Sequence, residues 1–166
     1  MSFNEINIKD IPESAIELFG KRWALIGAGD EKKHNIMTAS WGTLGRLWNK
    51  DVAVVFVRPQ RHTFGIIEQE DFFTINFLDE EYRNALKLCG EKSGKDLDKF
   101  SASSLTPYYV ESTTAVEESK YSIVCKKISK SKMSPCDFLD DAIECFYPNE
   151  DYHYIFIGEI IKVLEK

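Results

Sequence analysis

The stretch Val52-Ala-Val-Val-Phe-Val57 decides the fold class, because all six residues are apolar and four of them are valine. Such a run is typical of a β-strand, and its lack of polar alternation predicts a strand buried on both faces. The neighbouring stretch Phe72-Phe-Thr-Ile-Asn-Phe77 mixes aromatic and β-branched residues in the same way. These two segments predict a core built of β-structure.

Shorter signals on both sides extend this pattern. Further strands are expected over 23–28, 35–41, 121–126, 143–147 and 154–164. Gly158 inside the last of these predicts a bulge or the close approach of another backbone. Helices are fewer and short, and we expect them over 63–68, 80–89 and 96–100. Since the helices do not alternate regularly with the strands, the order favours a mainly β fold, with an antiparallel sheet closed into a small barrel and short helices outside it.

Size and charge limit the classes of protein to consider. The 166 residues predict one domain over 1–166, and a hydrophobic content of 43% excludes disorder as the main state. The formal net charge of −6 argues against general binding to nucleic acid or to an anionic membrane surface. No apolar run approaches the ~20 residues of a membrane span, and the N-terminus does not resemble a signal peptide. We therefore expect a soluble cytoplasmic protein.

The four cysteines and three histidines show no metal-binding spacing. Cys89, Cys125, Cys136 and Cys145 form no C-x-x-C pair, and His34, His62 and His153 do not complete a zinc pattern. The sequence therefore predicts no metal site. The cysteines are expected to be reduced and mostly buried thiols.

The segment Asn35-Ile-Met-Thr-Ala-Ser-Trp41 is the first candidate binding site. Small and hydroxyl-bearing residues at its end (Thr38, Ala39 and Ser40) would let a flat ligand lie against the backbone. The alternative is a strand that simply runs into a turn at Gly42.

The segment Arg58-Pro-Gln-Arg-His-Thr63 is the second candidate. Two arginines at the start of a helix suit an anion such as phosphate, and Thr63 could cap the helix or donate to that anion. Residues 42–63 carry four cations against one carboxylate, a local excess of three positive charges in an acidic chain. The alternative is a solvated turn followed by a capped helix.

Three other stretches carry weaker signals. Ser93-Gly-Lys-Asp96 resembles a capping box for the third helix, or it supplies a second phosphate contact from Ser93 and Lys95. His153 stands at the start of the last strand, where a lone histidine is either structural or functional. The basic run over 126–132 is expected to be an exposed loop. No G-x-S-x-G, H-E-x-x-H or G-x-G-x-x-G motif occurs, so the corresponding enzyme classes have no support.

Taken together, five stretches in order resemble the flavin reductase-like, FMN-binding split-barrel family, and its flavoredoxin branch in particular. They cover roughly residues 20–165: 35–41, 58–63, 73–77, 93–100 and 157–160. The resemblance implies a six-stranded antiparallel Greek-key split barrel with short peripheral helices. It also implies a homodimer with FMN held near the dimer interface.

The same resemblance assigns roles by position. It makes Met37, Thr38, Ala39, Ser40 and Trp41 cofactor-binding residues, with Thr38, Ala39 and Ser40 facing the isoalloxazine ring. It places Arg58, Arg61 and Thr63 on the ribityl-phosphate side, Asn76 beside the flavin, and Ser93 and Lys95 at the phosphate. His153 is the one catalytic candidate. Reductases of the family often show Asp-His here, whereas this chain has Tyr152 before His153 and Asp151 one residue earlier.

Three functions from different classes follow. The first is an NAD(P)H-dependent flavin reductase, in which the flavin carries the chemistry and the protein orients it. The second is a flavoredoxin-like electron-transfer protein whose tightly bound FMN is reduced by a protein partner. The third is a barrel that binds no flavin and acts as a structural or ligand-binding module.

Overall fold

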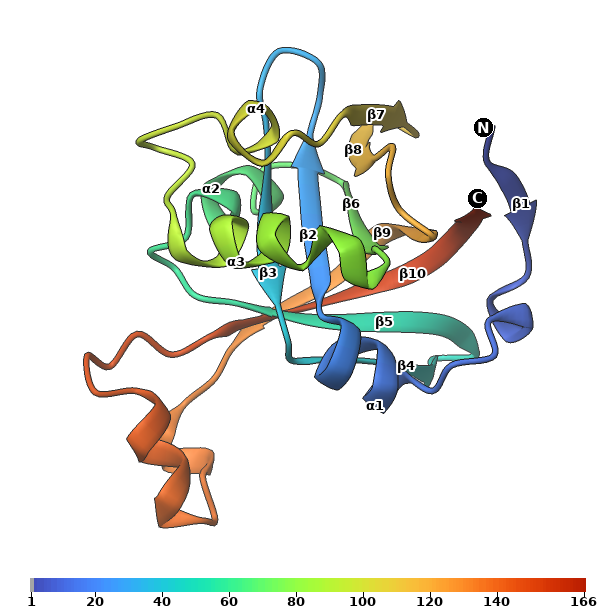
Figure 1. Ribbon diagram of the computed structural model, residues 1–166. Helices are drawn as coiled ribbons and strands as arrows, with labels where there is room; N and C mark the ends of the chain where they lie inside the picture. Colours follow the sequence, from blue (N-terminus) through green and yellow to red (C-terminus); the bar gives the residue numbers. More distant parts are fainter. Residues whose placement is uncertain (1) are drawn as a thin grey trace.

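A computed structural model describes residues 2–166 and shows a strongly curved antiparallel sheet with short helices on one side (Figure 1). The eight-stranded main sheet has the order β3-β2-β6-β9-β10-β5-β4, and β1 pairs with the free end of β10. A separate two-stranded sheet joins β7 to β8. The strands are β1 (Asn4–Ile6), β2 (Ala24–Gly29), β3 (His34–Ala39), β4 (Gly42–Leu47), β5 (Lys50–Val57), β6 (Phe72–Phe77), β7 (Pro107–Val110), β8 (Thr113–Val116), β9 (Tyr121–Lys132) and β10 (Tyr154–Glu165).

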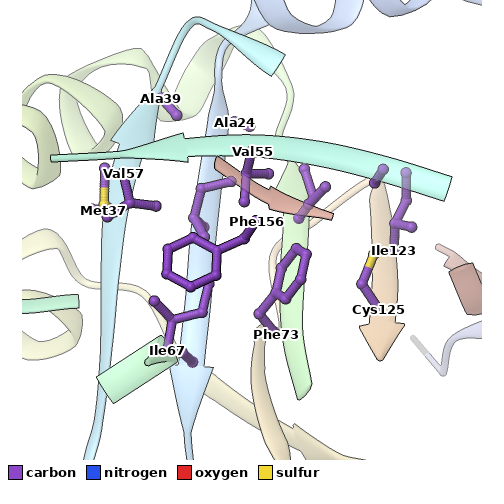
Figure 2. Close-up of a cluster of buried hydrophobic side chains, with 14 of the residues drawn as sticks. Ala24, Met37, Ala39, Val55, Val57, Ile67, Phe73, Ile123, Cys125 and Phe156 are labelled. Atoms are coloured by element: carbon purple, nitrogen blue, oxygen red, sulfur yellow. The ribbon is translucent and has the colours of Figure 1, made fainter. Parts of the chain in front are cut away.

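The sheet curls around one hydrophobic core, which makes it a barrel. Alternate side chains of six strands (β2, β3, β5, β6, β9 and β10) point into this core, as expected for strands with one face inward. Figure 2 shows Phe73 from β6 and Phe156 from β10 among the side chains that fill it. Within residues 2–166 the end strands β3 and β4 are not paired with each other, so the barrel is split along that line. The mainly β fold and its split barrel are therefore confirmed, whereas the main sheet has eight strands and not the six that the resemblance implied.

Helices cover the outer face of β2 and β3. These are α3 (Arg83–Glu91) and α4 (Lys99–Ser103), with η3 (Glu80–Tyr82) leading into α3, whereas α2 (His62–Ile67) packs Ile66 and Ile67 into the barrel core. Leu25 and Ile36 point outward from the barrel and form a second apolar cluster with Leu86 and Phe100 from α3 and α4. β2 is consequently buried at every position. The prediction that 52–57 is buried on both faces was wrong, because β5 has no helix on its outer side and Val54 and Phe56 are only half-buried.

The ladder between β9 and β10 is the longest in the molecule. Both strands have 12 residues, and their register shifts between Ile157 and Gly158 and again after Ile160. A Cβ atom on Gly158 would lie 2.6 Å from Cys125 Cβ and 2.7 Å from the Phe73 ring. Gly158 thus lies at a register shift, as predicted, but the groups that approach it closely are side chains and not another backbone. The basic run over 126–132 lies on β9 and not in a loop.

Between β9 and β10 the chain leaves the barrel in an excursion, residues 133–153, which projects away from the body in Figure 1. It contains η4 (Pro135–Asp137) and η5 (Asp141–Phe146). The strand predicted over 143–147 was therefore wrong. Its apolar and polar residues do alternate, but Asp140 caps the turn by accepting a hydrogen bond from the Ala142 N–H (3.0 Å), and no neighbouring strand offers a ladder.

The remaining differences concern short elements and the cysteines. The third helix begins at Lys99, not at residue 96, because Asp98 is its N-cap. The sequence patterns did not reveal β1, β4, β7, β8 or the N-terminal pair α1 (Ala15–Glu17) and η2 (Leu18–Arg22).

Cys89 and Cys125 are buried, whereas Cys136 and Cys145 lie exposed on the excursion, and all four are free thiols. No helix within residues 2–166 is both long enough and apolar enough to span a membrane.

Gly158→Ala tests the close packing between β9 and β10. The added methyl group would overlap Cys125 and Phe73, so we expect the free energy of unfolding to fall by about 1–3 kcal/mol. Gly45→Ala in β4 is the matched control, because a Cβ atom there meets nothing within 4 Å. Urea unfolding measures both. Equal stability of the two variants would contradict the close approach.

Candidate functional site

A pocket lies in the split of the barrel, between the free edge of β3 and the end of β5. We call it the Trp41 pocket. It has a volume of about 170 Å³ and is lined by residues 37–41 together with Phe56, Arg58, Arg61 and His153. β4 pairs with β5 only as far as Val55, so Phe56 and the residues after it are left open on this side. The split therefore exposes the backbone ends of two strands to one cavity.

Side chains alternate along β3, and this alternation decides which of its groups can contact a ligand in the pocket. Met37 and Ala39 point into the barrel core, while Thr38 points outward and donates its hydroxyl proton to the Leu86 carbonyl oxygen of α3 (2.5 Å). Since that proton is committed to the helix, the Thr38 side chain can offer a ligand only a lone pair. Ser40 and Trp41 follow the strand and are exposed.

Arg58 joins the pocket to the base of the excursion. Its guanidinium forms an ion pair with Asp151 (2.7 Å) and donates to the Phe146 carbonyl oxygen (2.9 Å). It also lies over the Tyr147 ring, with Cζ 4.9 Å from the ring centroid. Burial opposes ionisation of Asp151, but hydrogen bonds from Gln60 and Arg58 outweigh it and lower the pKa of this carboxyl. Arg58 thus has protein partners on several sides and chiefly holds the wall of the pocket.

A second pocket continues from the first, because Arg58 and Arg61 line both. We call it the Lys99 pocket. It has a volume of about 360 Å³ and is lined by residues 58, 60–63, 91–94, Lys99 and Asp151. Its cations come from three separate stretches of the chain, around Arg61, Lys92 and Lys99. The two cavities together form one elongated site.

Two of these cations are held by the C-terminal end of α3. Arg61 Nη1 donates to the Gly90 carbonyl oxygen (2.7 Å), and Lys99 Nζ donates to the Cys89 carbonyl oxygen (2.7 Å). The last carbonyls of a helix lack partners within it and carry partial negative charge, so cations are stabilised there. Each side chain keeps further N–H donors that this contact does not use.

Lys99 is the most deeply buried charged residue of the site. Only 2% of it is exposed, and burial, with a smaller contribution from the charge of Arg61, lowers its pKa to about 8. A buried ammonium with one hydrogen bond is costly unless an anion accompanies it. The Lys99 pocket therefore has the character of an anion site.

A buried hydroxyl adds a neutral donor beside these cations. Asn35 Nδ2 donates to Thr63 Oγ1 (2.9 Å), which fills an acceptor position of that oxygen and leaves its own proton free to point elsewhere. Thr63 is fully buried and lines the Lys99 pocket. Gly94 packs so closely on Asn35 that a Cβ atom there would lie 2.5 Å from Asn35 Oδ1. The turn over 93–96 thus packs against Asn35, the hydrogen-bond partner of this hydroxyl.

The structure brings together most of the residues predicted for the site. Residues 37–41, Arg58, Arg61, Thr63, Ser93 and His153 line the two pockets. Ser93 does not cap a helix; it accepts a hydrogen bond from the Lys95 backbone N–H within a turn. Thr63 lies inside α2 and does not cap it.

Two predicted residues lie outside both pockets. Asn76 is fully buried in the sheet, where it donates to the Leu25 carbonyl oxygen (2.9 Å) and accepts from Ser122 Oγ (2.8 Å). Lys95 is exposed on the 93–96 turn and does not line the Lys99 pocket. The charge excess over 42–63 is also divided, because Arg46 pairs with Asp51 and Lys50 with Glu159 on the β4–β5 hairpin.

Phe56 and Lys99 were missed as site residues. Phe56 belongs to a strand expected to be wholly buried, and only the early end of β4 leaves it open. Lys99 stands in the 93–100 stretch that resembles the family, directly after the helix cap Asp98. A lysine in the first turn of a short helix, where cations are disfavoured, was the available signal.

His153 lies at the bottom of the Trp41 pocket. Its Nδ1 atom is 2.8 Å from Tyr147 Oη, and its ring packs against Trp41, with centroids 5.2 Å apart. Burial, together with the positive charge of Arg58, lowers its pKa to about 4. The imidazole is therefore neutral at pH 7. Asp151 does not hydrogen bond to it, since that carboxylate is bound by Arg58 and Gln60.

The chain belongs to the family described as "Flavin reductase like domain", whose profile matches residues 16–166. None of the curated proteins with which the chain was compared matches it. It is thus a flavin reductase-like protein with the split-barrel fold of that family.

Solved structures with the same fold are similar along most of their length. Flavoredoxin of Desulfovibrio vulgaris (Miyazaki F) is 25% identical, with 87% of this chain and 69% of that chain covered and a TM-score of 0.67. A flavin reductase with a split barrel domain from Shewanella frigidimarina is 22% identical, with 95% and 74% covered and a TM-score of 0.67. An NADH:FAD oxidoreductase from Streptomyces globisporus, in complex with NAD and FAD fragments, is 14% identical, with 87% and 75% covered and a TM-score of 0.66.

The depressed pKa of His153 predicts a loss of stability in mild acid. Below pH 6.5 the unfolded chain takes up a proton that the folded protein does not bind until about pH 4. The free energy of unfolding should therefore fall by up to about 3 kcal/mol as the pH drops through this window. His153→Gln lacks this proton and should lose less. Urea unfolding at pH 7 and pH 4.5 gives the comparison, and an equal loss in both proteins would contradict the burial of a neutral imidazole.

Proposed function

We propose that this protein binds FMN and uses it as an NAD(P)H-dependent flavin reductase. The observation that carries the proposal is the joining of two unlike pockets through Arg58 and Arg61. One is lined by strand backbone and aromatic rings, and the other by several cations, of which Lys99 is buried. A ligand with a planar ring system at one end and a phosphate at the other would match these two linings.

The phosphate end would lie in the Lys99 pocket. Arg61 and Lys99 are already fixed by the carbonyls of α3 and keep spare donors, and the Thr63 hydroxyl has a free proton. Each charge-assisted hydrogen bond to a phosphate contributes roughly 1.5–3 kcal/mol. Ser93 and the backbone of its turn border the same space, which supports the predicted phosphate contact at that loop.

The ring end would lie in the Trp41 pocket. The backbone over 38–41 borders the pocket next to the free edge of β3 and can hydrogen bond to the polar edge of a flat ligand, while Phe56 and Trp41 supply apolar surface. Bound FMN would supply the capacity to accept a hydride, so the chain needs no general acid or base of its own. What the protein contributes is orientation and the exclusion of water.

Membership of the flavin reductase-like family supports this function, and a similar fold occurs in an NADH:FAD oxidoreductase. A second candidate is an electron-transfer protein whose FMN is reduced by another protein. The 25% identity with a flavoredoxin favours it, as does the position of Asp151, which binds Arg58 and leaves His153 without a carboxylate.

We also propose that a second copy of the chain completes the ring pocket. Trp41 is 42% exposed and Phe146 is 50% exposed, and their rings meet edge to face, with centroids 5.4 Å apart. Large aromatic side chains exposed together beside a pocket are typical of an interface. Sedimentation equilibrium tests this, since Trp41→Ser should weaken the dimer, and a wild-type monomer at all concentrations would exclude it.

One experiment separates the functions. Purified protein is loaded with FMN, freed of unbound flavin and mixed anaerobically with NADH or NADPH. A reductase bleaches the visible flavin absorbance within seconds to minutes. An electron-transfer protein retains FMN but bleaches only with a protein reductase. Protein that stays colourless after incubation with FMN excludes both.

Lys99→Met should weaken FMN binding by roughly tenfold or more, because a buried cationic donor is lost. Riboflavin has no phosphate, so its affinity should not change. Wild-type affinity for FMN should also fall as the pH rises from 7 to 9.5, since Lys99 loses its proton near pH 8, and Lys99→Met should lack this step. Fluorescence titration measures each value.

Lys95→Met is the matched control on the neighbouring turn. The sequence resemblance predicts that it weakens FMN binding, whereas the pocket lining predicts a much smaller effect than that of Lys99→Met. If Lys95→Met alone weakens FMN binding, the phosphate lies on the exposed side of the turn and not in the Lys99 pocket.

A further inference from the structure

Three side chains form a line from the excursion to the Trp41 pocket, and two of them, Tyr147 and His153, are buried. Tyr147 Oη lies 3.3 Å from Met133 Sδ on one side and 2.8 Å from His153 Nδ1 on the other. Tyr147 is 4% exposed and His153 is 7% exposed, so bulk water does not compete for the contact between them, whereas Met133 is half-buried. Within residues 2–166 the imidazole hydrogen bonds through Nδ1, and its other ring nitrogen, Nε2, forms no hydrogen bond to the protein.

The proton count allows two arrangements. A thioether sulfur only accepts, a tyrosine hydroxyl donates once, and a neutral imidazole carries one proton on one of its two nitrogens. Either Tyr147 donates to His153 Nδ1, which places the imidazole proton on Nε2, or His153 Nδ1–H donates to Tyr147 and Tyr147 donates to Met133. The first arrangement leaves the hydroxyl oxygen and the sulfur in contact with no proton between them. The second gives every buried donor an acceptor.

We infer that Tyr147 and Met133 fix His153 in the tautomer with its proton on Nδ1, so that an unprotonated Nε2 faces the Trp41 pocket. Tyr147 is then a positioning residue that acts through His153. The rings of Trp41, Phe56 and Tyr147 lie 5.2–6.5 Å from the imidazole, centroid to centroid, and keep it from turning over.

This tautomer sets which ligand edge the pocket accepts, and this step rests on the proposed function. A bare imidazole nitrogen accepts a hydrogen bond from an N–H group and repels a carbonyl or carboxylate oxygen. A planar amide-type N–H is present on the pyrimidine edge of a flavin and on the carboxamide of a reduced nicotinamide. Either source would satisfy the same acceptor.

The tautomer itself is measured on flavin-free protein, so the result does not depend on flavin binding. Histidine is labelled with nitrogen-15, and long-range proton–nitrogen correlation spectra are recorded at pH 7. We expect His153 to carry its proton on Nδ1. A wild-type protein with the proton on Nε2 overturns the inference.

Two variants test the positioning role. Tyr147→Phe leaves Nδ1–H without an acceptor, and Met133→Leu frees the Tyr147 proton to turn toward Nδ1, so both should shift the tautomer ratio toward Nε2–H by roughly tenfold or more. Tyr108→Phe removes a hydroxyl from β7 and should leave the ratio unchanged. A purely structural role for Tyr147 would lower stability in Tyr147→Phe without moving the ratio, and that outcome also overturns the inference.

Ligand pairs then identify the source of the N–H group. FMN is compared with its N3-methyl derivative, and NADH with reduced nicotinic acid adenine dinucleotide. Wild-type protein should prefer the N–H-bearing member of one pair by at least about fivefold, and Tyr147→Phe should reduce that preference. If neither pair is discriminated, Nε2 does not act as an acceptor in the pocket.

Discussion

The antiparallel ladder between β9 and β10 is the constraint on which the rest of the structure depends. It runs through the middle of the sheet, so β6 and β2 are added on one side and β5 and β4 on the other. Gly158 lets the Cys125 side chain of β9 and the Phe73 ring of β6 pack closely against β10 in the core. The same ladder ends at the pair Tyr154–Lys132, which delivers His153 to the split of the barrel. The β9–β10 ladder therefore fixes both the close packing of the core at Gly158 and the position of His153 in the site.

The site itself depends on how the protein manages positive charge. An acidic chain holds Arg61 and Lys99 inside a pocket because the C-terminal carbonyls of α3 accept their hydrogen bonds. Arg61 and Lys99 thus stabilise the C-terminal end of α3 and would also bind the ligand. The cost of burying Lys99 is offset in part by this helix end and would be offset further by an anion. Arg58, in contrast, is neutralised by Asp151 and mainly fixes the excursion.

The strands of the core could be predicted from the sequence because their apolar runs are long and reflect burial directly. The segment 143–147 misled because alternation indicates a strand only where a partner strand exists, and the excursion provides none. Within the site, the pocket lining over 37–41 follows from small residues at a strand end. Lys99 gave only one weak signal, its place in the first turn of a short helix, because its role depends on the Cys89 carbonyl, which the fold brings to it from α3. The chemistry of individual residues could be predicted from the sequence, whereas contacts between segments far apart in the chain could not.

The excursion over 133–153 begins and ends at residues that are paired side by side in the sheet. Lengthening or shortening it therefore costs the barrel little, because the ends of this loop are already held together. Yet Asp151 and His153, at its return to β10, line the two pockets. Changes in this loop can therefore alter what the cavity admits while the barrel that supports it stays the same.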